Sequence, residues 1–166
     1  MFKVILKLGD DISTDAIYPG RYMATVLPSE TPQYAFADYN EFNAKAKNNE
    51  FEQGSFIVAG NNFGCGSSRE QAASTLKGYE FSVIAKNFAR IFLQNAVNLG
   101  LSCIVCPDIE ASEGDEIEIK EKIVYNKTTG KNFIIIPLPK ARQTIIDAGG
   151  LIAYTRKRLM ETSNLQ

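Results

Sequence analysis

Short apolar runs alternate with helical repeats of apolar residues through the first two thirds of the chain. Four segments have the length, alternation or β-branched content of strands, and they are residues 2–8, 55–59, 81–85 and 101–105. Apolar residues recur at helical spacing over 88–99, before Gly100, and another helix is predicted over 69–77, with Gly78 as its cap. This order of strands and helices predicts a parallel sheet with helices on its faces and right-handed crossovers.

The pattern changes in the last third of the chain. Three further strand-like segments, separated by polar turns, are residues 116–119, 122–125 and 132–137. They predict a small antiparallel meander. A helix is expected over 138–148, ended by Gly149 and Gly150, and the charged tail from about residue 155 is expected to fray. Residues 1–166 are therefore interpreted as one α/β domain, with a mainly parallel sheet flanked by helices and a small meander.

Composition excludes several classes of function. The 166 residues, 45% apolar and 22% charged, are typical of one soluble globular domain with its own core. A net charge of −1 argues against a nucleic-acid-binding surface, which needs clustered Lys and Arg. No apolar run approaches the ~20 residues of a membrane span, and the charges within residues 1–8 argue against a signal peptide. We therefore expect a cytoplasmic protein without nucleic-acid or membrane partners.

The chain contains no histidine and three cysteines. Because the commonest general base and the commonest neutral metal ligand are missing, catalysis would depend on other side chains or on a partner. Cys103 and Cys106 lie at the end of a strand-like segment, where buried, inert thiols are common, and a redox-active pair is the alternative. The usual zinc ligand sets are incomplete, so no zinc site is assigned to this chain. Three cysteines without a signal peptide also favour a reducing compartment.

The segment from Gly60 to Glu70, between a predicted strand and a predicted helix, has the composition of a binding site. Its glycines permit positive φ and a close approach of a ligand to the backbone. Ser67 and Glu70 have the spacing of a capping box, in which the serine hydroxyl accepts from the Glu70 N–H. The free N–H groups of a helix N-terminus, together with Arg69, would bind a carboxylate. A turn used only for packing is the alternative, whereas the segment fits neither a P-loop nor a dinucleotide fingerprint.

Three segments resemble one known family. Residues 64–70, Gly-Cys-Gly-Ser-Ser-Arg-Glu, resemble the Gly-x-Gly-Ser-Ser-Arg-Glu signature of the swivel domain in the aconitase superfamily. Residues 11–17 resemble the companion loop of that domain, and residues 85–92 resemble the strand-to-helix segment that follows. The short chain is similar to the stand-alone small subunits of 3-isopropylmalate dehydratase. The resemblance implies a swivel-type β/β/α domain.

The resemblance also implies a shared active site, completed by a large subunit that carries a [4Fe–4S] cluster, and activity only in that complex. Ser67 matches the serine that removes the carbon-bound proton of the substrate. Ser68 and Arg69 match residues that bind its carboxylate. Arg21 and Thr25 fall in the stretch that reaches toward the substrate, and a solvated loop arginine is the alternative for Arg21. A Ser67 hydroxyl that caps the helix would not be free to act as a base, so these two expectations conflict.

The function that the resemblance favours is the interconversion of 3-isopropylmalate and 2-isopropylmalate by dehydration and rehydration, a step of leucine biosynthesis. Dehydratases of dimethylmalate, methylmalate (citramalate) or homoaconitate are alternatives within the class. The uncharged Ala24 favours a small apolar substituent over an additional carboxylate. A non-catalytic anion-binding module is the alternative from another class.

Overall fold

The computed structural model describes residues 1–163 and contains each of the predicted strands. In these residues the strands are β1 (Phe2–Lys7), β2 (Phe56–Ala59), β3 (Ser82–Ala85), β4 (Cys103–Val105), β5 (Glu116–Lys120), β6 (Ile123–Asn126) and β7 (Asn132–Ile134). The helices are α1 (Thr14–Ile17), α2 (Asn40–Lys47), α3 (Glu70–Gly78), α4 (Arg90–Leu99), α5 (Lys140–Asp147) and α6 (Leu151–Ser163), with 3-10 turns η1 (Gly20–Tyr22) and η2 (Thr31–Tyr34). The result is the mixed α/β domain that the sequence predicts.

A single sheet joins the parallel strands to the meander. Its order is β4-β3-β2-β1-β5-β6-β7, in which β1 to β4 run parallel and β5 pairs antiparallel with β1. The Ile136 N–H donates to the Val105 carbonyl at 2.8 Å, which joins the segment after β7 to the end of β4. The sheet therefore curls, and the meander folds back over the parallel strands.

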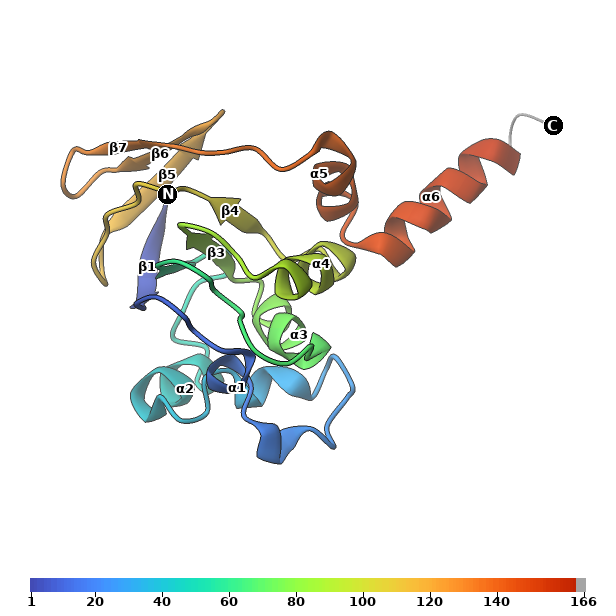
Figure 1. Cartoon of the computed structure of the whole chain (residues 1–166), viewed down its shortest axis with the longest axis horizontal. Coiled ribbons are helices and arrows are strands. Elements are labelled where there is room, and N and C mark those ends of the chain that lie inside the picture. The colour runs from blue at the N-terminus through green and yellow to red at the C-terminus, as the bar shows by residue number, and fades with distance from the viewer. Residues whose placement is uncertain (164–166) are drawn as a thin grey trace.

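Successive residues of the parallel strands contribute to two different cores. Ile57 and Val83 pack in the core that α2, α3 and α4 complete, whereas Val58 and Ile84 pack in a core completed by the meander. Figure 1 shows α1 to α4 on one side of these strands and β5 to β7 on the other. Because both faces are covered, β2 has four buried residues in a row, and its sequence shows no polar alternation.

Gly78 does not cap α3, contrary to the prediction. It is the last residue of that helix, and the chain takes its positive φ of 57° two residues later, at Glu80. A Cβ at Gly78 would lie 2.2 Å from the Cγ of Pro32. The missing side chain at this position therefore allows the segment around Pro32 to pack closely on α3.

The tail, for which the sequence predicted no regular element, is helical as far as Ser163, and its fraying stays a prediction. Gly149 and Gly150 end α5 with positive φ and pack against the end of α4, where a Cβ on Gly150 would lie 2.7 Å from the carbonyl oxygen of Asn98. α6 then begins with the Tyr154 N–H donating to the Gly150 carbonyl at 3.0 Å. Figure 1 shows α6 projecting from the domain. Within residues 1–163, no helix has the length and apolarity required to cross a membrane.

Candidate functional site

The three segments singled out in the sequence lie side by side. The Gly64 N–H donates to the Ile12 carbonyl at 2.7 Å, and the Thr14 N–H donates to the Cys65 carbonyl at 2.8 Å. A second parallel bridge joins Phe63 to Phe88, with the Ala89 N–H donating to the Phe63 carbonyl at 2.9 Å. Residues 64–70 are therefore held between the loop after β1 and the start of α4.

Gly64 is required by both conformation and packing. Its φ is +83°, and a Cβ built on it would lie 2.2 Å from the Cγ of Phe92, which is fully buried. A left-handed backbone is costly for residues with a Cβ, and a buried aromatic ring of α4 cannot move aside without a loss of packing. This contact fixes the height of the loop above α4 and so helps to set where Ser67 lies.

The predicted capping box at Ser67 is wrong. The N-cap residue of α3 is Arg69, and no side chain makes a capping bond there. The main-chain oxygen of Ser67 instead accepts from the Arg69 N–H at 2.9 Å and from the Thr14 hydroxyl at 2.9 Å. Ser67 and Ser68 are both exposed residues. The conflict between capping and catalysis therefore disappears, because α3 does not use the Ser67 hydroxyl.

The Arg69 side chain is oriented by the loop that contains Asp15. Its Nη1 forms an ion pair with the Asp15 carboxylate and also donates to the Tyr18 carbonyl at 3.2 Å. The same carboxylate accepts from the Gly20 N–H at 2.9 Å. The hydrogen bonds from Arg69 and then from Gly20 lower the pKa of the Asp15 carboxyl, so it remains charged. Asp15 thus joins the serine loop to η1.

Arg21 and Thr25 lie on the segment that follows Asp15, but they do not meet Arg69 directly. The guanidinium of Arg21 forms a forked ion pair with Asp38 and lies over the Tyr22 ring, 4.7 Å from its centroid. Both members of this ion pair are about half exposed, at 51% and 58%. Thr25 contributes its carbonyl, which accepts from the hydroxyl of Tyr18 at 3.2 Å. The segment is thereby linked to Arg69 through Tyr18, whose own carbonyl Arg69 contacts.

Sequence reasoning missed the positioning roles of Asp15 and Tyr18. Asp15 lies inside the loop that the resemblance identified, but its spacing alone does not indicate which cation it meets.

Sequence reasoning also missed a polar cluster where β1, β2 and β3 end. There Asp10 accepts from the N–H of Asn61 at 2.6 Å, and the Asn87 side chain donates to that of Asn61 at 2.7 Å. Carboxyl ends of parallel strands meet at one edge, which is the signal that could have grouped these residues.

The cysteines do not form a metal centre. Cys103 and Cys106 are buried, and burial raises the pKa of the Cys103 thiol strongly and that of Cys106 to about 11. Cys65 lies in the serine loop and pairs with Ser13, and it belongs to neither core. In the part of the chain described, no three His, Cys, Asp or Glu side chains are grouped to hold a metal ion.

Comparisons with known proteins agree on one family. Residues 14–108 match the model of the aconitase C-terminal domain. The 3-isopropylmalate dehydratase small subunit of Methanosarcina mazei is 45% identical, over 93% of this chain and 96% of its own length. This chain belongs to the family of 3-isopropylmalate dehydratase small subunits. Small subunit 1 of this dehydratase from Archaeoglobus fulgidus is 43% identical, over 90% of this chain and 93% of its own.

The fold agrees with a solved member of the small-subunit family. The crystal structure of a 3-isopropylmalate dehydratase from Methanocaldococcus jannaschii has a TM-score of 0.89 and 38% identity, covering 99% of this chain and 98% of that chain. The predicted family and the predicted α/β fold are therefore confirmed. The family model spans the serine loop, Asp15 and Tyr18, so all the contacts around Arg69 described above fall within the matched region.

Proposed function

We propose that this chain supplies half of the active site of a two-subunit hydro-lyase that interconverts 3-isopropylmalate and 2-isopropylmalate. The observation that carries the proposal is the exposed Ser67-Ser68-Arg69 loop, whose arginine is already oriented while its serines face solvent. Removal of a carbon-bound proton by a hydroxyl requires a site closed from water, and this face is open. A large subunit that covers the loop would supply the closure, and the names of the relatives support such a partner.

Arg69 is the residue we assign to substrate carboxylate binding, together with the Ser68 hydroxyl. Both contacts that orient Arg69 use Nη1, so Nε and Nη2 remain on the other edge of the guanidinium. Two parallel N–H donors match the geometry of a carboxylate. Asp15 holds the fork in place before the substrate arrives, which reduces the rotamer entropy lost on binding.

Ser67 is the residue we assign as the base. Its Oγ, as the alkoxide, would take the proton from the substrate carbon adjacent to the one that bears the departing hydroxyl. It would return the proton during rehydration. A serine hydroxyl becomes basic enough only where positive groups stabilise the alkoxide. The N-terminus of α3, which no side chain caps, and the guanidinium of Arg69 provide positive charge beside this loop.

The cluster of such an enzyme would reside on the large subunit, because within residues 1–163 the three thiols of this chain are not grouped around one point. An aconitase-type cluster acts as a Lewis acid toward a hydroxyl and a carboxylate of the substrate. The contribution of this chain is therefore the base, the carboxylate clamp and part of the wall of the site.

Arg21 and Thr25 are proposed as the part of that wall that contacts the substrate. Arg21 is held by Asp38 on an exposed surface, so exchanging that ion pair for a substrate carboxylate costs little. The same segment exposes Met23, Val26 and Leu27. An apolar loop next to an arginine suits a malate that carries a branched aliphatic substituent.

The experiment combines this chain with its large subunit under anaerobic conditions and measures turnover of 3-isopropylmalate, dimethylmalate, citramalate and homocitrate. We expect selective turnover of 3-isopropylmalate, and none by this chain alone. Ser67→Ala should reduce kcat by about 10²–10⁴-fold while the complex and its cluster stay intact. Ser29→Ala, also at an exposed serine, is the matched control and should leave turnover unchanged.

Each other outcome changes a particular assignment. Selective turnover of another malate would retain the mechanism and change the substrate. Normal turnover by a Ser67→Ala complex would remove Ser67 from the role of base. No turnover of any of the four, with a stable complex and an intact cluster, would favour a non-catalytic anion-binding module.

A further inference from the structure

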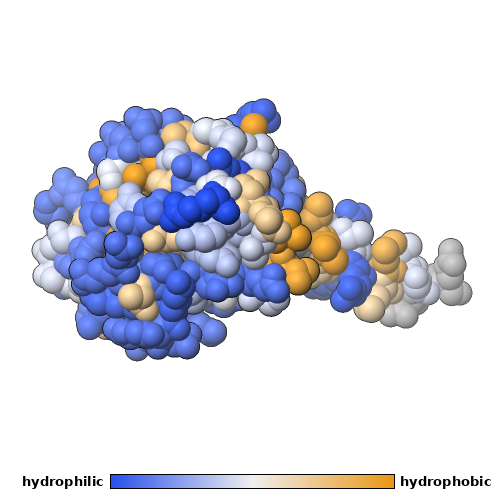
Figure 2. Space-filling model, turned by 90° about the horizontal axis from the view of Figure 1, so that it is seen from below, coloured by the Kyte–Doolittle hydropathy of each residue, from blue (hydrophilic) through white to orange (hydrophobic). Residues whose placement is uncertain are grey.

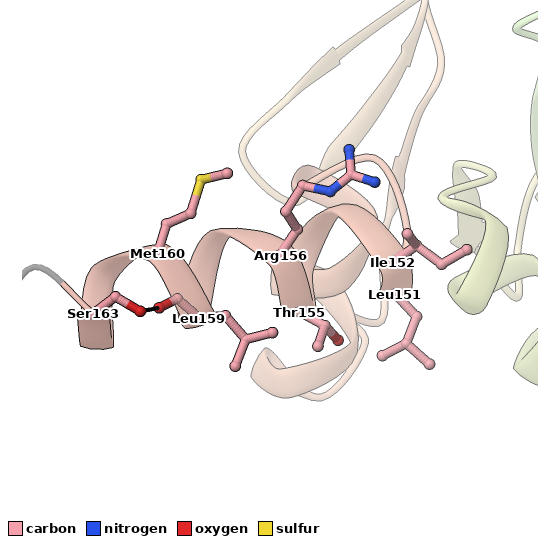
Figure 3. A pocket seen from close by; sticks show the side chains of 7 residues that line it. All are labelled: Leu151, Ile152, Thr155, Arg156, Leu159, Met160 and Ser163. Carbon is pink, nitrogen blue, oxygen red and sulfur yellow. Dashed lines mark hydrogen bonds between the residues drawn. The ribbon is translucent and has the colours of Figure 1, made fainter.

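The last helix presents an apolar face that nothing in the described chain covers. Leu151, Ile152, Leu159 and Met160 are 40%, 77%, 63% and 60% exposed. With Thr155, Arg156 and Ser163 they form one exposed face of α6 (Figure 3). Figure 2 shows apolar side chains gathered along α6 and at its junction with the domain.

Such a helix needs a partner to be stable. α6 has 13 residues, none of them buried, and it contacts only its neighbours α4 and α5 near its base. Isolated helices of this length are marginal in water, and most helices in proteins are stabilised by packing of their apolar face. The exposed apolar face therefore indicates a docking surface.

A groove of matching character lies at the opposite end of the molecule, along β1. Two adjoining cavities of about 290 and 330 Å³ share Ile5 and Phe51 in their lining, which gives the groove an apolar floor. Five glutamates and two lysines line it, for a net charge of 2 − 5 = −3, and they are Glu41, Glu50, Glu52, Glu113, Glu116, Lys3 and Lys45. We name this surface the β1 groove.

We propose that α6 of one copy of this chain docks in the β1 groove of a second copy. α6 is about 20 Å long at 1.5 Å per residue, and β1, which runs along the groove, is also about 20 Å long. Arg156 is the charged residue on the apolar face of α6, so the charge of that face is opposite in sign to that of the groove. The apolar face of the helix covers the apolar floor, and Arg156 within that face meets the glutamates.

The geometry excludes one simpler pairing, and a second is less favourable. Figure 1 shows α6 and β1 at opposite sides of the molecule, so the helix cannot reach the groove of its own chain. An antiparallel pair of two α6 helices would bring Arg156 of both copies together near the centre of the 13-residue helix, which is unfavourable. Because the two docking surfaces differ, the assembly is closed in one of two ways. Two chains each place their α6 in the groove of the other, or several chains form a ring. This contact is separate from the serine loop and does not depend on the proposed activity.

The test reverses the charge of each surface separately and measures the mass of the full chain in solution by light scattering. The helix-reversed variant is Arg156→Glu, and the groove-reversed variant is Glu52→Lys with Glu116→Lys. We expect the unmodified chain to self-associate. Each variant alone should associate at least about tenfold more weakly, because two like-charged surfaces then face each other.

Mixing the two variants is the decisive step. The reversed, acidic helix face of one meets the reversed, basic groove of the other, and the remaining two surfaces are unchanged, so an equimolar mixture should regain the mass of the unmodified assembly. The matched control is Glu30→Lys with Asp108→Lys, which changes two exposed carboxylates outside the groove and should associate normally. Circular dichroism checks that all variants are folded.

Three outcomes would each overturn the proposal. The unmodified chain could be monomeric over the whole concentration range. The helix-reversed variant could associate as strongly as the unmodified chain. The two variants could remain separate when mixed, although each had lost association alone. A monomer whose binding to the large subunit weakens on helix reversal would assign α6 to that partner instead.

Discussion

Replacing Gly64 with alanine tests the packing that supports the serine loop. The substitution adds a Cβ at a φ of +83°, which costs about 1–2 kcal/mol, and that Cβ lies 2.2 Å from the Cγ of Phe92. Overpacking a buried site costs about 1–3 kcal/mol more, so Gly64→Ala should reduce the free energy of unfolding by about 2–5 kcal/mol. The assay is urea unfolding followed by circular dichroism. The loss of unfolding free energy is calculated from the shift of the urea midpoint, provided that the m-value is unchanged.

Gly130→Ala is the matched control. Gly130 has a similar φ of +74°, but an added Cβ would find no atom within 4 Å, so only the conformational cost of about 1–2 kcal/mol remains. In a Phe92→Ala background the loss from Gly64→Ala should become smaller, because Cγ and the ring are removed, although the Cβ of residue 92, 2.4 Å from the added carbon, remains. Equal losses for Gly64→Ala and Gly130→Ala, or no coupling to residue 92, would refute the reasoning.

Three further predictions concern the side chains around the loop. Asp15→Asn should raise the KM of the two-subunit enzyme about tenfold with little change in kcat, because Arg69 is then no longer held in position before the substrate binds. An unchanged KM would contradict this role of Asp15. Arg69 lowers the pKa of the Asp15 carboxyl below its ordinary 3.8. The ion pair therefore stabilises the folded protein above that pH, and this contribution is lost as the pH falls through the pKa of Asp15 in the folded state. Urea midpoints should therefore fall less steeply with acid in Asp15→Asn, and parallel curves would argue against the ion pair. A thiol reagent at about pH 8 should label Cys65 first, because burial raises the pKa of Cys103 and Cys106, and equal labelling of all three in the native protein, measured by mass spectrometry, would disprove their burial.

The sequence predicted the regular elements well where local pattern and tertiary packing agree. Apolar runs over β2 and β3 are continuous because both faces are covered, and the αL residue Gly100 ends α4 as its position suggested. Pairing of β5 with β1 was not predictable, because it depends on contacts between residues more than a hundred positions apart. Gly78 was misinterpreted because its role depends on Pro32, far away in sequence, and not on the local turn.

The candidate site shows the same division. A motif identified Ser67, Ser68 and Arg69, which stay assignments until turnover is measured. The capping box was wrong because the spacing of Ser67 and Glu70 is compatible with a cap, but the helix begins later, after Arg69. The helix in the tail was missed because the prediction for that segment considered its charge alone. α6 is anchored at its base by close packing of glycine backbones, which no sequence pattern indicates.

The position of β1 within the sheet has a consequence for synthesis of the chain. β1 is made first, yet it lies between β2 and β5, and β5 ends at Lys120. At roughly 5–20 residues per second, a ribosome needs on the order of 6–25 s after β1 to make β5. During that time one edge of an apolar N-terminal strand has no partner from its own chain, so nascent chains are exposed to pairing with other unfinished chains. The rate of translation, or a chaperone that binds the first 60 residues of the nascent chain, would therefore affect the yield of folded protein more than its final stability.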